Sequence, residues 1–356
     1  MFSPSSLAFL KRLLDTPGPS GYESAPARVW RDEAKSFGAE VSQDVAGNSM
    51  ATINPQGSPT IMLDGHIDEI GVIVQYIDDE GYVHISPIGG WDPQVLVAQR
   101  IRFVTETGEV FGVVGKKPIH LIKADDREKA SKITDLWVDI GAKNKAEASE
   151  RLTVGDPGVI DSRALDFPNG RLVSRSIDDR IGAFVVLEAL RRYAAKPGKA
   201  KVVAVATTQE EIAWNGGGAL VCAECIGPQM AVVVDVTFAT DHPGMEKKEH
   251  GEHPLGSGPV LSRGGLISPV AFRLLRDAAA RLKMTHSLHG VGRDTSTNAD
   301  AIAIAREGVA TALLSIPNRY MHSPNEMIDL ADVDAAAELL AETCRSVDGS
   351  VDFTDR

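Results

Sequence analysis

The two ends of the chain alternate between helical apolar patterns and short apolar runs that are typical of buried strands. In the first expected helix, residues 5–15, leucines recur at helical spacing, whereas residues 60–63 form a short apolar run that ends at an Asp-Gly pair. Helices that alternate with buried strands in this way predict an α/β domain. The expected helices cover residues 5–15, 24–37, 177–193, 268–282, 300–306 and 332–347, and one more ends at Cys225. The expected strands include two within residues 40–54, then residues 60–63, 230–234 and 310–316 and the run that starts at Lys201.

The middle of the chain has a different pattern, with short strands, turn residues between them and no alternation with helices. Thr107 and Gly108 are typical of a hairpin turn between two of these strands. The expected strands are residues 71–75, 81–86, 100–105, 109–114, 137–140 and 159–161. We therefore expect a mostly β module, residues 70–166, inserted into a larger α/β domain that is made of residues 1–69 and 167–356.

Composition and charge disfavour several classes of function. The 356 residues are 43% hydrophobic and 24% charged, which is typical of a globular chain with room for two domains. The net charge of -12 disfavours nucleic acids and anionic membrane surfaces as partners. No apolar run reaches about 18 residues, so no transmembrane helix is expected. The amino-terminal helix also lacks the basic region that precedes the apolar part of a signal peptide.

Three cysteines in so long a chain favour a reducing compartment, and we expect a cytoplasmic protein. Cys222 and Cys225 form a lone C-x-x-C, which offers too few ligands for a structural zinc site. We expect both to be buried thiols on one face of a helix, and a metal or redox role is the less favoured alternative.

The apolar run that starts at Lys201 leads directly into two adjacent carboxylates, Glu210 and Glu211. Unpaired charge beside a buried strand is costly, so we expect a cation beyond this end of the strand. Taken alone, the pair is better explained as an acidic surface loop. The other segments change that interpretation.

Five side chains that can bind metals stand at strand ends or in adjoining loops: His66, Asp178, Glu211, Asp235 and His322. Each has an ordinary structural explanation, such as a helix cap for Asp178 or a loop histidine for His66. Their recurrence at the strand ends where α/β sheets bind ligands favours one joint metal site. Two imidazoles and three carboxylates suit Zn, Co or Mn. Five ligands exceed what one tetrahedral zinc requires, and they fit a hydrolytic site with two metals if one carboxylate bridges.

Two further carboxylates then acquire candidate roles in catalysis. Glu210 is the neighbour of a candidate ligand, and we expect it to take the proton from the attacking water as a general base. Asp68 lies two residues after His66 on an extended backbone, where it can hydrogen-bond the imidazole and orient it.

Five motifs carry these residues, in the order G-H-I-D-E-I-G, S-I-D-D-R-I-G, T-T-Q-E-E, V-D-V-T and R-Y-M-H-S-P. In sequence and order they resemble the tetrahedral aminopeptidases, the forty-second family of metallopeptidases, whose members are often labelled glutamyl aminopeptidase or cellulase-like protein. The segment G-G-W-D-P-Q-V-L-V-A-Q-R of the insert is also similar to that family. The resemblance therefore covers nearly the whole chain.

The resemblance implies a mixed-sheet α/β/α metallopeptidase domain with a dinuclear centre of Zn or Co. In that centre His66 and Asp235 bind one metal, and Glu211 and His322 bind the other. Asp178 bridges the two metals.

The same resemblance implies that Glu210 is the general base and that Asp68 orients His66. The implied activity is the removal of amino-terminal residues from peptides. The insert, residues 70–166, is then a small β-barrel-like dimerisation domain. The implied dimers can build a hollow tetrahedral dodecamer, which admits only unfolded peptides.

Two segments depart from the pattern of the family, and both lie where the family builds its substrate pocket. Residues 212–219, I-A-W-N-G-G-G-A, are longer than the usual Val-Gly-Leu-Arg-Gly-Ala and lack its Arg. Residues 298–301, N-A-D-A, keep the Asp of the usual Gly-Thr-Asp-Ala but change the two residues before it. The expected metal ligands are unaffected, but a specialised substrate such as a small modified dipeptide stays open.

Three other functions remain as alternatives. A related two-metal deacylase or carboxypeptidase-like enzyme would need a cation for the substrate carboxylate, and Arg293 or Arg319 could provide it. Paired carboxylates also cleave glycosides, but the two candidate histidine ligands disfavour that chemistry. A non-catalytic assembly protein would lack a ligand or the base, and none is missing here.

Overall fold

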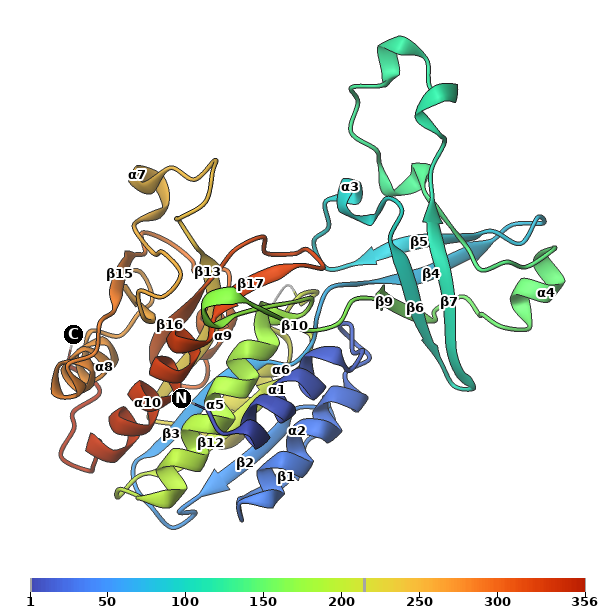
Figure 1. Ribbon diagram of the computed structural model, residues 1–356. Helices are drawn as coiled ribbons and strands as arrows, with labels where there is room; N and C mark the ends of the chain where they lie inside the picture. The colour runs from blue at the N-terminus through green and yellow to red at the C-terminus, as the bar shows by residue number, and fades with distance from the viewer. Residues whose placement is uncertain (1, 214–215, 356) are drawn as a thin grey trace.

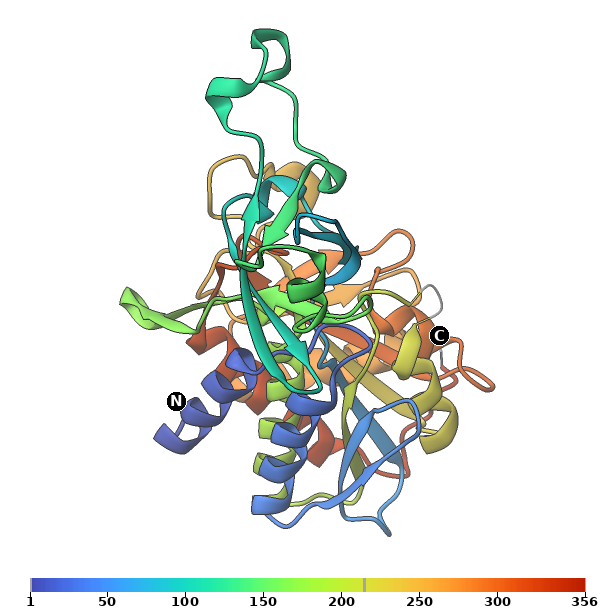
Figure 2. The same cartoon turned by 90° about the vertical axis from the view of Figure 1, so that its right-hand side faces the viewer.

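The computed structural model describes residues 2–213 and 216–355, so Trp214 and Asn215 of the departing segment lie outside the described residues. A large α/β lobe and a smaller β lobe make up the molecule (Figure 1). The β lobe is built from the middle of the chain, and its segment around residues 116–136 reaches furthest from the α/β lobe (Figures 1 and 2).

One mixed sheet of eight strands forms the centre of the α/β lobe in the part of the chain that the structure describes. In sheet order the strands are β1 (Glu40–Gln43), β2 (Ser49–Ile53), β12 (Lys201–Thr207), β3 (Thr60–His66), β13 (Met230–Phe238), β16 (Ala310–Asn318), β14 (Val260–Arg263) and β15 (Ser287–Gly290). The central strands β12, β3, β13 and β16 run parallel, because helices connect them. They are buried almost throughout, as expected for parallel strands that are covered on both faces.

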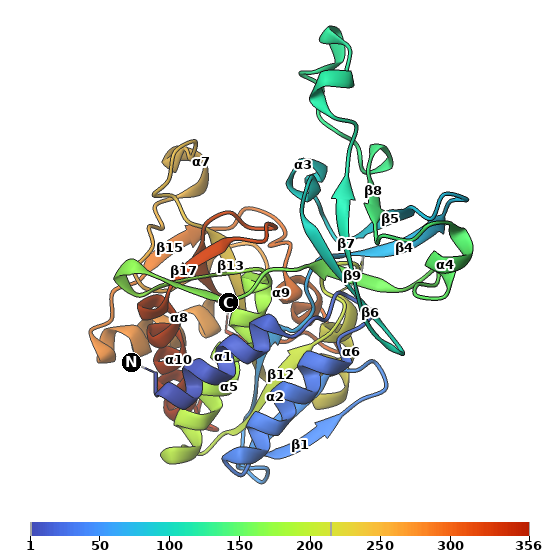
Figure 3. The same ribbon diagram turned by 45° about the vertical axis from the view of Figure 1, so that its right-hand side comes forward.

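Helices cover both faces of this sheet and complete the predicted α/β/α arrangement (Figures 1 and 3). On one face, α5 (Ile177–Ala195) packs against the central strands, and α1 (Pro4–Asp15), α2 (Ser24–Ser36) and α10 (Leu330–Ser346) pack around it, with α8 (Pro269–Leu282) beside α10. The other face carries α6 (Gly217–Ile226) and α9 (Asn298–Ala303). None of the helices described is both long and apolar enough to cross a membrane.

Local sequence signals explain where several of these helices begin. Ser268 caps α8 by accepting a hydrogen bond from the amide of Ala271, and Pro269 occupies the first turn, as the sequence predicts. In α5, Asp179 accepts from the amide of Gly182 at 3.1 Å, so the helix cap that could have explained Asp178 is made by its neighbour. Asp178 and Asp179 are joined by a cis peptide bond.

The β lobe is a closed barrel of six antiparallel strands in the described residues, which confirms the predicted barrel-like insert. Its apolar core includes Val83, Ile101, Phe103 and Val138, all fully buried. In barrel order the strands are β4 (Gly71–Ile77), β5 (Val83–Ile88), β8 (Trp137–Asp139), β7 (Gly108–Gly115), β6 (Arg100–Thr105) and β9 (Pro157–Ile160). The lobe also contains α3 (Pro93–Leu96), α4 (Lys145–Ser149) and the 3-10 turns η1 (Ile119–Leu121), η2 (Ala124–Asp126) and η3 (Ile133–Asp135).

A small sheet lies near the junction of the two lobes, and the sequence pattern does not reveal it. It consists of β10 (Leu165–Phe167), β11 (Arg171–Ser174) and β17 (Glu326–Asp329), with η4 (Pro168–Gly170) between the first two; α7 (Lys247–His250) follows β13 in the α/β lobe. These strands are three or four residues long, so they are too short to produce a clear alternation of apolar and polar residues.

The expectation for the two neighbouring cysteines is half wrong. Cys222 is buried, but Cys225 is exposed. A spacing of three residues turns the second side chain by about 60° around the helix. Because α6 covers the sheet as an outer layer, that rotation is enough to bring Cys225 to the surface.

Arg180 ties the start of α5 to the first loop of the chain from a fully buried position. Its guanidinium donates to the carbonyls of Leu13, Thr16 and Gly18 and, from Nε at 2.9 Å, to that of Ile67. It also lies 3.0 Å from Oε1 of Glu69. One side chain therefore satisfies a buried carboxylate and several backbone carbonyls.

Replacing this arginine should destabilise the fold severely. The variant Arg180→Met leaves the Glu69 carboxylate and several carbonyls with fewer donors, and we expect a loss of about 3–5 kcal/mol. The matched control is Arg281→Met, which removes a half-exposed side chain that pairs with Glu342 and should cost less than about 1 kcal/mol. Urea unfolding monitored by circular dichroism measures both, and equal losses would contradict this role of Arg180.

Candidate active site

The ends of four parallel strands open into a cavity of about 370 Å³. The register pairs His66, the last residue of β3, with Thr207, the last residue of β12. Asp235 lies in β13, and the loop after β16 carries His322. All five predicted metal ligands line this cavity together with Glu210. Parallel strands bring these distant residues together because their carboxyl ends share one edge of the sheet.

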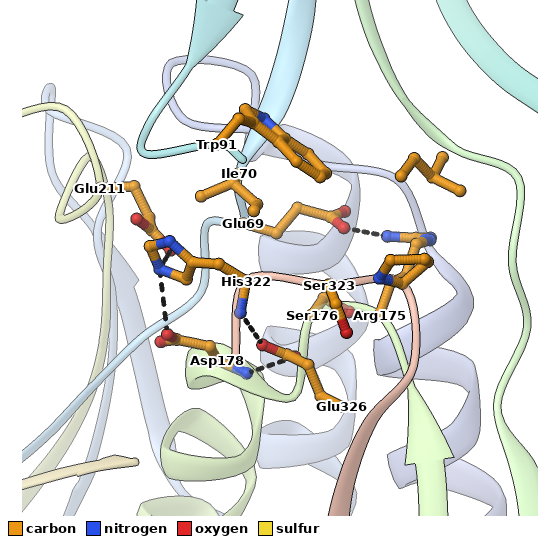
Figure 4. A pocket seen from close by; sticks show the side chains of 12 residues that line it. Glu69, Ile70, Trp91, Arg175, Ser176, Asp178, Glu211, His322, Ser323 and Glu326 are labelled. Atoms are coloured by element: carbon orange, nitrogen blue, oxygen red, sulfur yellow. Dashed lines mark hydrogen bonds and ion pairs between the residues drawn. The ribbon is translucent and has the colours of Figure 1, made fainter. Parts of the chain in front are cut away.

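Asp178 lies between the two predicted histidine ligands. Its Oδ1 is 3.3 Å from Nε2 of His66, and its Oδ2 is 3.3 Å from Nε2 of His322. Figure 4 shows the imidazole of His322 directed toward Asp178 and Glu211. One carboxylate thus presents an oxygen to each imidazole, which is the geometry of a bridging group.

The remaining carboxylates complete the cluster on either side of Asp178. Oε1 of Glu211 lies 3.4 Å from Nε2 of His322, and Oε2 of Glu210 lies 3.8 Å from Nε2 of His66. Ligand atoms of His66, Glu210 and Asp235 all lie within 4.8 Å of one another, and so do those of His66, Asp178 and Glu211. The two glutamates that are adjacent in the sequence therefore face different parts of the cluster.

Asp68 lies beneath the cluster and contacts both His66 and the loop of the two glutamates. Its Oδ1 is 3.3 Å from Nδ1 of His66. The same carboxylate accepts hydrogen bonds from the amides of Glu210, at 3.2 Å, and Glu211, at 3.1 Å. It also accepts a short hydrogen bond from the hydroxyl of Ser20. The predicted contact between Asp68 and His66 is therefore present, and it is one of several.

His322 is oriented by the barrel and by a buried glutamate that the sequence does not reveal. Its Nδ1 lies 2.8 Å from the carbonyl oxygen of Gly90, in the loop after β5. Glu326 accepts from the amides of His322, at 2.9 Å, and Asp178, at 3.0 Å (Figure 4). A single acidic residue before the apolar pair in E-M-I-D is the sole signal for it in the sequence.

Asp179 also belongs to the site, although the sequence suggests for it nothing more than a helix cap. It is fully buried, and its Oδ2 accepts from the amide of His66 at 3.2 Å. Burial and the negative charge of Asp235 raise its pKa well above the ordinary value. Asp178, its neighbour in the D-D pair, is the residue that contacts His66 and His322.

Proximity shifts the pKa values of the imidazoles and of Asp178 in opposite directions. Burial opposes protonation of both histidines, but the carboxylates beside them outweigh burial. The pKa of His66 is therefore raised well above its usual value, and that of His322 is raised to about 11. Burial would raise the pKa of Asp178, but His322 and His66 together lower it.

The other carboxylates of the cluster are shifted upward. Burial raises the pKa of Glu210 to about 8, and it also raises that of Glu211. The pKa of Asp235 is raised well above its usual value by burial and by the charge of Asp178. Burial is the main cause of these shifts, and the other carboxylates in the same small volume add to it.

The residues of the cavity fit divalent cations. Oε1 of Glu211 is buried and has no hydrogen-bond partner within the described part of the chain, although Nε2 of His322 is 3.4 Å away. Four carboxylates surround two imidazoles in the cluster, so the charges do not balance without cations. Imidazole nitrogens and carboxylate oxygens are the donors that Zn and similar ions bind.

A second cavity of about 600 Å³ adjoins the first and shares Glu210 and Glu211 with it. Asn298 and Asp300, from the segment 298–301 that departs from the family pattern, line it. Asn298 is nevertheless buried, and its side-chain nitrogen donates to Asp64 and to Thr207, each at 2.9 Å. This asparagine therefore fastens α9 to the central strands as well as lining the cavity.

A deacylase or carboxypeptidase-like enzyme would need an arginine for the substrate carboxylate. None of the described residues that line the two cavities is an arginine. Arg319 makes a two-pronged ion pair with Asp241, at 2.9 Å and 2.7 Å. Arg293 is exposed and does not line either cavity.

Comparisons with known proteins show relatives along nearly the whole chain. The family model for M42 glutamyl aminopeptidase matches residues 47–339. A lysyl aminopeptidase of Pyrococcus furiosus is 37% identical over 334 residues, which cover 93% of this chain and 94% of that protein.

Solved structures show the same fold. A TET aminopeptidase from a marine sediment archaeon of the Thaumarchaeota has a TM-score of 0.92 at 32% identity, over 97% of each chain. A TET peptidase of Pyrococcus horikoshii that can assemble into a tetrahedron or a large octahedral shell has a TM-score of 0.84 at 28% identity. That match covers 96% of this chain and all of the other.

These findings confirm the resemblance to the tetrahedral aminopeptidases, because the family model spans most of the chain and the relatives match it nearly end to end. The chain belongs to the M42 family of metal-dependent aminopeptidases and is a hydrolase that acts on peptide bonds.

Proposed function

We propose that this protein is an aminopeptidase with a dinuclear metal centre, which removes amino-terminal residues from peptides. The position of Asp178 carries the proposal, since its two oxygens face the two histidines at equal distances of 3.3 Å. A carboxylate in that position can hold two cations at once. A single tetrahedral metal would use no more than four of the five candidate ligands.

We assign His66 and Asp235 to one metal and Glu211 and His322 to the other, with Asp178 between them. Zn or Co suits this set of nitrogen and oxygen donors, and Mn is a further candidate. When bound, the two cations supply a polarised carbonyl and a water that ionises near neutral pH. The imidazoles must be neutral to bind them, so metal binding displaces the protons that the carboxylates now stabilise.

Glu210 is the proposed general base. Its side chain lines both cavities, and its Oε2 lies 3.8 Å from Nε2 of His66, beside the metal ligands. In this position a carboxylate oxygen can accept the proton of the attacking water and return it to the leaving amine. Asp68 contributes by holding Nδ1 of His66 and the amide of Glu210.

Peptides are the proposed substrates, and the proposed location is the cytoplasm. The cavities of about 370 and 600 Å³ meet at Glu210, so they can hold residues on both sides of a scissile bond. The carboxylates of the cluster suit a free amino terminus. The three cysteines form no disulfide within the described residues, which suits a reducing compartment.

A panel of peptides tests the activity. After chelation the protein should cleave nothing, and added Zn or Co should restore cleavage of peptides with a free amino terminus, because the amine needs the carboxylates and the metals. Peptides with an acetylated terminus serve as the control and should stay intact. Cleavage of the acetylated peptides would instead favour a deacylase or an endopeptidase.

The variant Glu210→Gln tests the base. It keeps the shape of the side chain but cannot accept a proton, so turnover should fall by a factor of about 10²–10⁴ while metal content is unchanged. The exposed Glu224, on α6, provides the matched control Glu224→Gln, which should keep full activity. Kinetics and metal analysis by mass spectrometry measure both effects. Normal turnover in Glu210→Gln would refute this role.

The barrel, residues 70–166, is proposed as a dimerisation domain, and residues 1–69 and 167–356 form the proposed catalytic domain. Phe111 and Val113, on β7, are 51% and 49% exposed and project from the same side of the strand. Exposed apolar side chains on one strand face favour burial against a second copy of the chain. The tetrahedral shell of the Pyrococcus horikoshii relative supports assembly of such dimers into a dodecamer.

Charge on that face should prevent assembly. The double variant Phe111→Glu/Val113→Glu places carboxylates in the proposed interface, and light scattering after gel filtration should show a smaller particle than that of the wild type. The control Val154→Glu changes a valine that is also exposed but lies outside the barrel strands. Unchanged assembly of the double variant would exclude this face as the interface.

A further inference from the structure

The loop that carries Glu210 and Glu211 is held from behind by side chains. We name residues 208–211 the glutamate loop; it follows directly after β12. Each of its four backbone amides donates to a side-chain oxygen. The acceptors are Asn48 for Thr208, Glu23 for Gln209 and Asp68 for both Glu210 and Glu211, at 2.9, 3.1, 3.2 and 3.1 Å. The position of the loop therefore depends on acceptors from three distant parts of the chain.

Glu23 is the charged acceptor that has no place in the proposed mechanism. It stands immediately before α2 and is 6% exposed. Its Oε1 accepts from the amide of Gly21, at 2.6 Å, as well as from Gln209. No ion pair joins it to a basic residue within the described parts of the chain. Burying a carboxylate without a cation costs free energy, and hydrogen bonds from backbone amides offset part of that cost. The role of Glu23 is therefore to be found in the amides that it accepts from, those of Gly21 and Gln209.

The amide that Glu23 holds belongs to a strained residue. Gln209 has φ 62°, in the left-handed region that residues other than glycine seldom adopt. Such a conformation persists where surrounding contacts enforce it. The turn at Gln209 directs the next two amides toward Asp68 while the side chains of Glu210 and Glu211 line the cavities.

Open space behind the glutamate loop means that the hydrogen bond to Glu23 is needed to keep the loop in place. A cavity of about 680 Å³ lies on that side, and Glu23, Thr208 and Gln209 are among its lining residues. Little packing therefore opposes a movement of the loop away from the cluster. The opposite side of the loop faces the catalytic cavities, so any relaxation would withdraw Glu210.

We propose that Glu23 is a positioning residue that holds the glutamate loop in its catalytic conformation. It belongs to the segment T-P-G-P-S-G-Y-E, residues 16–23, whose hydroxyl of Ser20 also donates to Asp68. Arg180 fixes the start of the same segment through the carbonyls of Thr16 and Gly18. The inference rests on the proposed function, because the loop has a catalytic conformation only if Glu210 is the general base.

The test compares Glu23→Ala and Glu23→Gln in the metal-loaded full-length protein. Removing the acceptor in Glu23→Ala should lower kcat at saturating metal by about 10–100-fold, as for other groups that orient a catalytic residue, and leave KM unchanged. Glu23→Gln keeps an acceptor oxygen and should restore most of kcat. The control is Glu33→Ala on α2, the helix that follows Glu23, where the partners of Glu33 are Arg191 and Arg12.

Hydrogen exchange of the peptide that contains residues 208–211 provides a measurement independent of activity. Exchange should accelerate in Glu23→Ala and stay at the wild-type rate in Glu23→Gln and Glu33→Ala. Wild-type kcat and exchange in Glu23→Ala would overturn the inference, and so would a lower melting temperature with unchanged kcat. If the wild type cleaves no free-amine peptide, the proposed function fails, and hydrogen exchange still decides whether Glu23 holds the loop.

Discussion

The concentration of buried carboxylates at one edge of the sheet is the constraint on which the site depends. Asp178, Glu210, Glu211 and Asp235 share a cavity with two imidazoles, and their charges repel one another in a medium that screens poorly. Burial first, and then that repulsion, raise the pKa values of Glu210, Glu211 and Asp235. Divalent cations would relieve this repulsion. The repulsion that destabilises the cluster without cations therefore favours the binding of metal.

Holding such a cluster in place requires hydrogen-bond donors and acceptors from every part of the chain. Asp68 connects His66 to the amides of both glutamates, and Glu326 connects the backbones of Asp178 and His322. The barrel takes part as well, since the carbonyl of Gly90 lies 2.8 Å from Nδ1 of His322. The insert therefore acts on the orientation of His322, a proposed metal ligand, as well as on the shape of the molecule.

The sequence predicts most of the architecture because long apolar periods specify it. The central strands and the long helices appear near their expected positions, and the six short strands of the insert close into the expected barrel. The prediction fails where the signal is short or depends on a neighbour. The small sheet at the junction of the lobes has strands of three or four residues, and the exposure of Cys225 depends on how α6 lies on the sheet.

By itself, the sequence determined the fold class, the family and the side chains that can bind metal, because periodicity and residue chemistry are local properties. The tertiary structure alone decided which of these groups meet and which others support them. Asp179, Glu326 and Glu23 are ordinary acidic residues in the sequence, and they acquire roles because folding buries them against the amides of distant loops. A buried carboxylate must find donors, and those donors exist in the folded chain alone.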